Sequence, residues 1–450
     1  MHTPLPWTWR PLLLSLVLLL KACAYPNHRY ACIIDAGSSG SRVRVYEWPT
    51  RATFMELPQL EEVASMKRKP GISKLVDDDA ELEKHVQDLV NIGKMEVPVD
   101  HHEDTPIYLM ATAGTRLLLE ERANKLIEKV RNLLERRDIS PFEFRRQNAR
   151  ILSGEEEGAY AWVAVNYLRG AFADPSMPKV GVLELGGAST QIAFQPAASI
   201  LADKYPVRLA GRTYQLYVHS YLHYGIDYTI LWIREQVLRQ NPQQEIVYDP
   251  CMLKGDETIT TIAEKKVVVR GSGNYSRCYD LVDQFVYSGD EKICWPKPCA
   301  IGTVYQPTIT DDIQFYAIAA FYFGAKHLRA VDEHGKYSPG IIREKAQAYC
   351  AMNITEGQKY SEEASLVYVS SYCLQGVYQS ILFNKAYRLP LDQKRIKAVS
   401  KIHDKKPAWV IGALLSEIEK RTMFCIGGAA NSSPTSGLYI MLIIFSVTIF

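Results

Sequence analysis

The chain lacks an excess of charge of either sign, a low-complexity tract in its globular part, and a hydrophobic run that spans a bilayer comfortably. Its 450 residues include 52 basic and 50 acidic side chains, which leaves a net charge of +2. A balanced charge creates no field that recruits a polyanion, so the composition argues against a nucleic acid polymer as partner. The length allows two domains with a sizeable core.

Cysteine is scarce in the first half of the chain and clustered in the second. Six of the nine cysteines lie between Cys251 and Cys373, and an even set of this kind predicts disulfides and an oxidising compartment. Sequence proximity favours three pairs, Cys251–Cys278, Cys294–Cys299 and Cys350–Cys373. Zinc is the alternative for Cys294 and Cys299, but no second His/Cys pair lies nearby to complete four ligands.

Two further observations concern the same compartment. Cys32 lies in an apolar run and is predicted to be a buried free thiol. Sequons at Asn274, Asn353 and Asn431 are glycosylation sites typical of a luminal or extracellular chain.

Both ends carry hydrophobic segments. Residues 11–20 form an apolar run that ends before Ala-Cys-Ala at 22–24, which predicts a signal peptide over 1–24, with an uncleaved signal anchor as the alternative. Residues 437–450 form an apolar tail after small and polar residues, as in a lipid-anchor signal or a membrane-spanning tail. Either reading attaches the protein to a membrane and leaves its bulk outside the cytosol.

A glycine-rich segment occurs twice. Residues 35–43 read Asp-Ala-Gly-Ser-Ser-Gly-Ser-Arg-Val, and residues 184–192 read Glu-Leu-Gly-Gly-Ala-Ser-Thr-Gln-Ile. Each copy follows a short apolar run and leads into an alternating stretch, which predicts strand, tight turn, strand. Two such units predict two similar lobes that face one another.

These turns suit a phosphate clamp, since backbone N–H groups reach a phosphate only where no side chain blocks them. Asp35 and Glu184, at the heads of the turns, can hold a metal ion directly or through water. A pair of ordinary Gly-rich hairpins is the alternative.

Two other segments carry polar residues at predicted strand ends. The stretch 112–116 ends in Arg116, which can offer a bidentate cation to a terminal phosphate, or can pair with Glu120 or Glu121 at a helix start. The stretch 153–162 contains three consecutive acids, which either favour a helix N-terminus or include one that activates a water. The residues alone do not decide between these readings.

The first half alternates strands with amphipathic helices, with helical stripes over 82–90 and 126–134, and predicts an α/β fold with ligands at strand ends. The stretch 196–307 is more irregular and carries four of the six clustered cysteines. We therefore expect it to be an insertion on the second lobe.

Taken together, the four polar segments resemble the apyrases, or nucleoside triphosphate diphosphohydrolases. The match continues through 319–323, 372–373 and 409–413, and it covers about residues 28–420. The stretches 69–73 and 40–42 look closest to the endomembrane (Golgi and lysosomal) subgroup. The resemblance implies two actin-like, RNase H-like lobes with the active site in the cleft between them. It also implies hydrolysis of nucleoside triphosphates and/or diphosphates that depends on Ca²⁺ or Mg²⁺ and releases the terminal phosphate without a phosphoenzyme.

The resemblance also assigns roles to residues. Glu157 would activate the attacking water and Gln191 would position it, while Asp35 and Glu184 would hold the metal through water. Tyr322 would stack on the base, unless it is a core aromatic. The residues that would bind the phosphates are Ser38, Ser39, Gly40, Thr112, Arg116, Gly187, Ala188 and Ser189. Glu184 departs from the family, which usually has Asp there, and this puts metal preference and rate in doubt.

The implied organisation is a first lobe over 28–168 plus about 392–422, and a second lobe over 169–391 with the disulfide-bearing insertion. Nucleotides are the expected substrates, and the expected location is the lumen of the secretory pathway or the cell exterior. The alternatives are a phosphotransferase of the actin-like superfold and a catalytically inert receptor or adhesion protein on the same scaffold. The intact acids Asp35, Glu157 and Glu184 argue against the inert protein.

Overall fold

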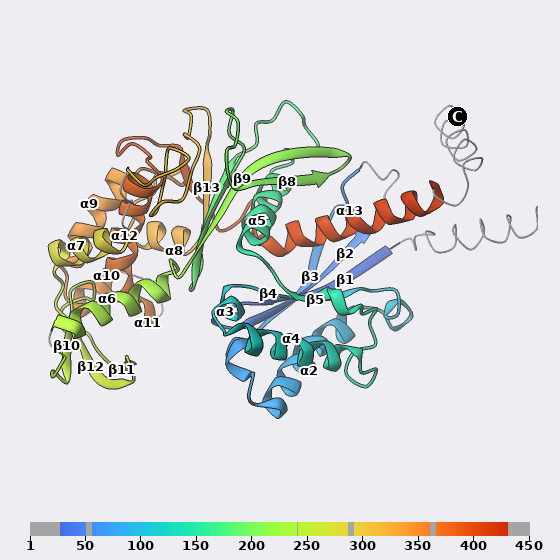
Figure 1. Cartoon of the computed structure of the whole chain (residues 1–450), viewed down its shortest axis with the longest axis horizontal. Helices are drawn as coiled ribbons and strands as arrows, with labels where there is room; N and C mark the ends of the chain where they lie inside the picture. The colour runs from blue at the N-terminus through green and yellow to red at the C-terminus, as the bar shows by residue number, and fades with distance from the viewer. Residues whose placement is uncertain (1–27, 51–55, 241, 287–291, 361–365, 431–450) are drawn as a thin grey trace, which may run out of the picture.

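The computed structural model describes residues 28–50, 56–240, 242–286, 292–360 and 366–430, which form two lobes (Figure 1). The predicted signal segment 1–24, the tail 437–450 and the sequon at Asn431 lie outside this part of the chain. Among the described residues, no helix is both long enough and apolar enough to cross a bilayer.

The first lobe is built on a five-stranded sheet of order β3-β2-β1-β4-β5. The β1–β2 and β2–β3 pairs are antiparallel, and the β1–β4 and β4–β5 pairs are parallel. The strands are β1 His28–Ala36, β2 Ser41–Pro49, β3 Glu61–Arg68, β4 Ile107–Ala111 and β5 Ala149–Ile151.

The second lobe repeats this pattern inside a seven-stranded sheet of order β14-β15-β13-β6-β7-β9-β8. Here β6 is antiparallel to β7 and parallel to β13, β7 is antiparallel to β9, and β13 is parallel to β15. The strands are β6 Gly181–Leu185, β7 Ser189–Phe194, β8 Lys204–Leu209, β9 Arg212–Leu222, β13 Phe315–Ala319, β14 Lys336–Tyr337 and β15 Ile396–Ala398. The run β9-β7-β6-β13-β15 therefore corresponds to β3-β2-β1-β4-β5, and the prediction of two similar α/β lobes is confirmed.

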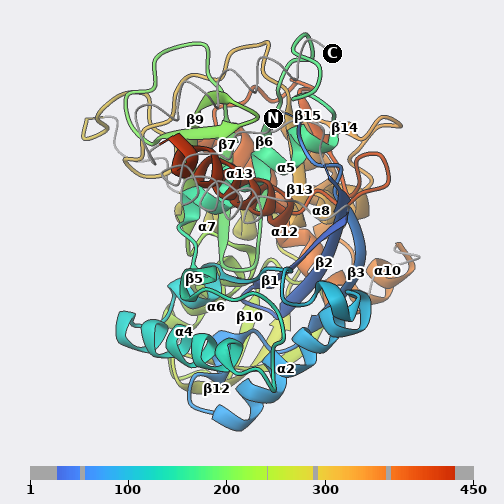
Figure 2. The same cartoon turned by 90° about the vertical axis from the view of Figure 1, so that its right-hand side faces the viewer.

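Two amphipathic helices cover the outer face of the first sheet (Figure 2). They are α2 Asp79–Glu96 and α4 Glu120–Glu135. Their apolar stripes include Leu82, Val86, Leu126 and Val130, all buried in one cluster with the strand residues beneath. The predicted helical stripes at 82–90 and 126–134 are confirmed.

Two other helices lie between the sheets, α5 Gly154–Leu168 and α13 Trp409–Ala430 (Figures 1 and 2). Their apolar residues share one buried cluster with β1 and β2 on one side and with β6, β7 and β9 on the other. The helices approach closely, because a Cβ added at Gly412 would overlap the carbonyl oxygen of Tyr160.

The lobe boundaries predicted from the sequence stay a prediction, and two elements near them have contacts in both lobes or in the second sheet. Helix α5 was predicted for the first lobe within 28–168, but it packs on the seven-stranded sheet and on α13. Within the predicted stretch 392–422, β15 pairs with β13 in the second sheet, whereas α13 lies between the lobes. The cause is that α5 is buried on nearly every side, so no apolar stripe in its sequence indicates which sheet it covers.

Helices α8, α9 and α12 pack on the second sheet in the largest cluster. The disulfide-bearing region adds α6, α7 and a small sheet of order β10-β12-β11. The stretch 196–307 is only partly an insertion, since β8 and β9 within it extend the main sheet.

The remaining longer elements are α6 Ile226–Gln240, β10 Ile246–Asp249, β11 Glu257–Ile262, β12 Lys265–Gly271, α7 Tyr275–Phe285, α8 Ala320–His327, α9 Pro339–Cys350 and α12 Ser371–Ile381. Shorter helical pieces are η2 Ile72–Leu75, η3 Val99–His101, α3 Ala113–Arg116, η4 Arg146–Asn148, α10 Ile354–Tyr360, α11 Leu366–Val369 and η5 Leu382–Ala386.

The three disulfides form as predicted, Cys251–Cys278, Cys294–Cys299 and Cys350–Cys373. Cys32 is a buried free thiol, as predicted. Asn274 and Asn353 are exposed, and the side-chain oxygen of each caps a helix N-terminus by accepting from the backbone N–H of Arg277 and Glu356, respectively. The capping bonds use the side-chain oxygen and not the amide nitrogen of each asparagine, so both sequons remain candidates for glycosylation.

Candidate active site

The two glycine-rich turns face each other across a cavity of about 480 Å³ between the lobes. A Cβ added at Gly187 would lie 3.0 Å from Oγ of Ser38, and one added at Gly114 would lie 2.6 Å from the Cα of Ser38. Glycine at 114 and 187 is therefore required for the close approach of these segments to Ser38. The turns and the segment after β4 enclose a space whose size suits a chain of phosphates.

The acids at the heads of the turns, Asp35 and Glu184, end β1 and β6 and both line the cavity. Burial raises the pKa of Asp35, and Arg44, Arg42 and Lys67 oppose that rise. Burial also raises the pKa of Glu184 well above its usual range, and the charges of Glu157 and Asp35 raise it further.

This pair fits a divalent cation. Oε2 of Glu184 is buried without a hydrogen-bond partner in the described structure, and two buried carboxylates favour a positive charge beside them. In the described ranges, no three His, Cys, Asp or Glu side chains gather into a metal site. The donor set is thus two acids, to be completed by water and phosphate oxygens, which is how Mg²⁺ is commonly bound.

The acidic segment after β5 separates its three glutamates by their surroundings. Ser153 and Glu156 form a capping box at the start of α5, and Glu156 also pairs with Arg150 at 2.8 Å. Only Glu157 of the three lines the cavity, with 8 % of its surface exposed. Glu157 is therefore the one of these three acids that faces the cavity, and its role as the base stays a prediction.

Glu157 is held by an ion pair. Nη2 of Arg116 donates to Oε2 of Glu157 at 2.6 Å. Burial raises the pKa of Glu157 to about 7, with Arg116 opposing the rise and Asp35 adding to it. A carboxyl group with a pKa near neutrality is suited to accept a proton from water.

Gln191 lies next to Glu157 in a network of hydroxyl and amide groups. Its Nε2 donates to Oγ of Ser189 at 2.7 Å, to Oγ of Ser220 at 3.1 Å and to Oε2 of Glu157 at 3.4 Å. Ser220 was missed by the sequence analysis. It lies on β9 directly opposite Gln191, a relationship that no local motif indicates.

The structure brings most of the predicted phosphate-binding residues to the cavity wall, and Tyr322 with them. Arg116 and Gln191 are not among the lining residues; they contact Glu157 from behind. The lining members of the predicted set are Ser38, Ser39, Gly40, Thr112, Gly187, Ala188 and Ser189.

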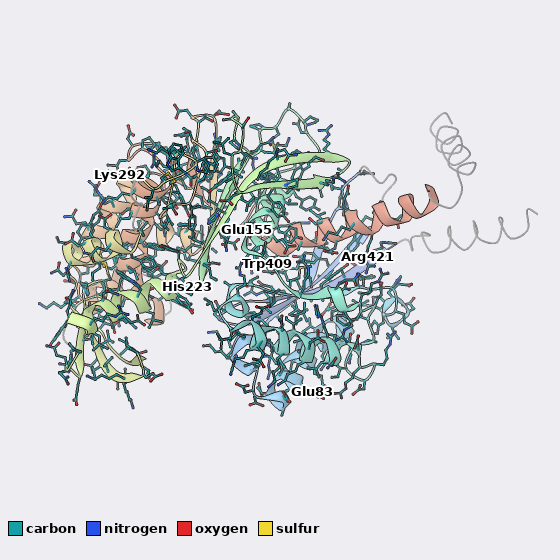
Figure 3. All side chains as sticks on the ribbon, in the orientation of Figure 1. Glu83, Glu155, His223, Lys292, Trp409 and Arg421 are labelled. Carbon is teal, nitrogen blue, oxygen red and sulfur yellow. A yellow bond between two sulfur atoms is a disulfide. The ribbon has the colours of Figure 1, made fainter. Side chains whose placement is uncertain are left out.

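Several other residues of the site were not predicted from the sequence. The cavity is also lined by Arg42, Arg44, Lys67, Lys406 and Trp409, and Figure 3 shows Trp409 where α13 begins between the lobes. Asp227 lies behind the second turn, where its backbone N–H donates to the carbonyl oxygen of Gly187 at 3.0 Å.

Two duplicated α/β lobes with paired glycine turns, facing acids and a buried carboxyl group of near-neutral pKa define a protein built to bind and cleave phosphate chains. The chain belongs to the GDA1/CD39 (nucleoside phosphatase) family, whose model matches residues 22–429. The resemblance seen in the sequence motifs is thereby confirmed at the level of the family, and the endomembrane subgroup stays a prediction.

Relatives agree with this assignment. The chain is 30% identical over 448 residues to ectonucleoside triphosphate diphosphohydrolase 1 of Bos taurus, covering 91% of this chain and 84% of the bovine protein. It is 32% identical over 372 residues to probable apyrase 1 of Oryza sativa subsp. japonica, covering 79% and 74%. The fold resembles a nucleoside triphosphate hydrolase of Neospora caninum with a TM-score of 0.68 at 14% identity, covering 96% of this chain and 100% of that one.

Proposed function

We propose that this protein hydrolyses nucleoside triphosphates and diphosphates in the cavity between the lobes, releasing the terminal phosphate by direct attack of water. The observation that carries the proposal is the position of Glu157, a cavity-lining carboxyl group whose pKa is about 7. The names of the bovine and rice relatives support nucleotides as the substrates.

In this mechanism Glu157 accepts a proton from the water that attacks the terminal phosphorus. Gln191, fixed by Ser189 and Ser220, donates to Glu157 from behind and so positions the carboxylate that orients the water. The backbone N–H groups of both turns bind phosphate oxygens at positions where glycine leaves them accessible. No covalent intermediate is needed, because the base acts on water itself.

Asp35 and Glu184 would hold Ca²⁺ or Mg²⁺, partly through water. When bound there, the cation supplies positive charge to the phosphate oxygens and so favours attack. The two residues lie at equivalent ends of β1 and β6, so each lobe contributes one acid. A cation bound to both acids would therefore also fix the two lobes relative to one another.

The proposal extends to a location outside the cytosol, with attachment to a membrane through the hydrophobic ends. The three disulfides and the exposed sequons at Asn274 and Asn353 support an oxidising, luminal or extracellular setting. Glycosidase treatment of the protein from secretory-pathway membranes should increase its electrophoretic mobility. Unchanged mobility of protein from that source would count against glycosylation.

The decisive experiment is phosphate release from ATP, ADP, UDP, GDP and CTP with Ca²⁺ or Mg²⁺, compared between the wild type and Glu157→Gln. We expect release by the wild type only. Phosphate transfer to a sugar hydroxyl instead of water would indicate the phosphotransferase, and binding without turnover would indicate the inert receptor. The panel also ranks bases and chain lengths.

A further inference from the structure

The cavity has two ends that are related by the duplication of the fold. In the first lobe, Asp35 pairs across the sheet with Arg42, which pairs with Lys67. In the second lobe, the corresponding row is Glu184, Gln191 and Ser220. Directly paired residues on neighbouring strands lie on the same face of a sheet, so each row extends from its acid along the cleft.

The helices follow the same correspondence. Helix α5 comes after β5 and brings Glu157 to the side of the cavity where Gln191 and Ser220 lie behind it; we call these three residues the water end. Helix α13 comes after β15, the counterpart of β5, and its start brings Lys406 and Trp409 to the cavity. The start of α13 is thus the structural counterpart of the start of α5.

The two ends carry different charges. At the water end the carboxyl group of Glu157 lines the cavity, and the guanidinium of Arg116 and the amide of Gln191 contact it from behind. The other end has four cavity-lining cations, Arg42, Arg44, Lys67 and Lys406, which we call the cationic end. One duplicated frame therefore presents a proton acceptor at one end and positive charge at the other.

The cations of this end have few protein partners. Arg44 is 5 % exposed, and although its Nε lies 3.1 Å from Oε2 of Glu62, Nε and Nη1 have no hydrogen-bond partner in the described structure. Nζ of Lys67 donates to Oγ of Ser39 in the first turn at 3.2 Å. A buried guanidinium with free donors beside a cavity is suited to bind an anionic ligand.

Resting on the function proposed above, we propose that the cationic end binds the inner phosphate of the substrate, the one that stays with the leaving nucleotide. Attack from the water end forms a bond from the water oxygen to the terminal phosphorus and passes a proton to Glu157. The bond from that phosphorus to the bridging oxygen breaks, and its electron pair stays on the leaving phosphate. In-line displacement places this leaving group on the side opposite the water. There Arg42 and Lys67 stabilise the negative charge that develops on the leaving phosphate.

The position of Tyr322 agrees with this polarity. It lies on α8, directly after β13, and lines the same cavity. In the first sheet, β4 and β5 lie on the side of the water end. Their counterparts in the second sheet, β13 and β15, lie on the side of the cationic end. A base stacked on Tyr322 would therefore place the phosphates nearest the nucleoside at the cationic end.

The test is calorimetric binding of the magnesium salt of imidodiphosphate, whose nitrogen bridge resists hydrolysis and which needs no base contact. We expect Arg42→Gln and Lys67→Met each to raise the dissociation constant at least about tenfold, the usual effect of losing one charge-assisted hydrogen bond. Lys84→Met, an exposed lysine on α2, removes the same charge and should change it less than twofold. Arg42→Lys should recover most of the affinity.

Affinities within threefold of the wild type for both variants would overturn the proposal. A loss confined to Lys67→Met would also overturn it, because the lost bond to Ser39 would explain it. Lys67 and Arg42 are not core residues, and thermal melting checks that each variant folds. If the wild type binds imidodiphosphate through Arg42 and Lys67 but releases no phosphate from nucleotides, the proposed function fails and this site stands. If nucleotides are hydrolysed while both variants keep their affinity for imidodiphosphate, the proposed function stands and the inner-phosphate site fails.

Discussion

The guanidinium of Arg116 donates to the carboxylate of Glu157 at 2.6 Å, and both side chains are largely buried. Arg116 lies on α3 at the end of β4, whereas Glu157 lies on α5, which packs on the second sheet. The ion pair thus joins the first lobe to the helix that carries the proposed base. Two measurable properties depend on it, the orientation of the carboxylate and its pKa.

The first prediction concerns Glu157 itself. Glu157→Gln keeps the shape and the cavity position but cannot accept a proton, so nucleotide binding should persist while turnover falls by roughly 10²- to 10⁴-fold. Stopped assays of phosphate release and calorimetric binding measure the two effects. Glu155→Gln, at the neighbouring acid that does not line the cavity, is the matched control and should turn over normally. A crippled Glu155→Gln beside an active Glu157→Gln would refute the assignment.

The second prediction concerns pH. Glu157 acts as a base only in its carboxylate form, and its pKa is about 7. The value of kcat/KM should therefore rise with pH up to about neutrality. A cation bound nearby lowers the pH at which this rise ends. Arg116 holds the pKa of Glu157 down, so Arg116→Gln should move the acid limb upward, by about 1 unit. Arg122→Gln, which breaks an exposed ion pair with Asp77, should not move it. A downward shift with Arg116→Gln would contradict the electrostatic role.

The third prediction concerns the metal. EDTA should abolish activity, and Ca²⁺ or Mg²⁺ should restore it, because Asp35 and Glu184 are buried acids that line one cavity. Glu184→Asp shortens the side chain by about 1.5 Å, one carbon–carbon bond. Mg²⁺ demands stricter geometry than Ca²⁺, so this variant should lose more activity with Mg²⁺, and Glu184→Ala should lose activity with both. Wild-type rates for Glu184→Ala would remove Glu184 from the metal site.

The repeated segments and the acidic cluster made much of this site predictable. Asp35 and Glu184 follow apolar strands directly, so their placement at equivalent strand ends depends only on local sequence. Cysteines close in sequence also paired as expected. These features share one property, namely that the residues involved are neighbours along the chain.

Features that depend on pairing between distant segments were not predictable in this way. Lys67 reaches the cavity because β3 pairs with β2, and Ser220 reaches Gln191 because β9 pairs with β7. The packing of α5 is a related case, since α5 follows the first sheet in sequence but is apolar on almost every face. Its position is decided by the sheet and helix that bury it, and neither is encoded in α5 alone.

The fourth prediction concerns the disulfide Cys350–Cys373, which joins α9 to α12 across 23 residues of sequence. Replacing both cysteines by alanine should lower the free energy of unfolding by about 3 kcal/mol, because the unfolded chain gains loop entropy. Denaturant unfolding measures the change, and peptide mapping without reduction should show this pair and Cys294–Cys299 linked. Free thiols at these positions in protein from the secretory pathway would contradict the pairing.

The last prediction concerns Gly412, where α13 meets α5. A Cβ at this position would overlap the carbonyl oxygen of Tyr160 on α5, and backbone cannot move aside as a flexible side chain can. Gly412→Ala should therefore force the helices apart and cost about 1–3 kcal/mol of stability, the usual range for overpacking. Since α5 also carries Glu157, the same displacement should lower kcat in variants that remain folded.

Gly170→Ala is a useful contrast, because an added Cβ there meets nothing within 4 Å although its φ of +75° is strained. It should lower stability through backbone strain and leave kcat unchanged. Equal kcat for Gly412→Ala and the wild type, with the stability loss present, would show that the α5–α13 contact supports the fold without setting the position of Glu157.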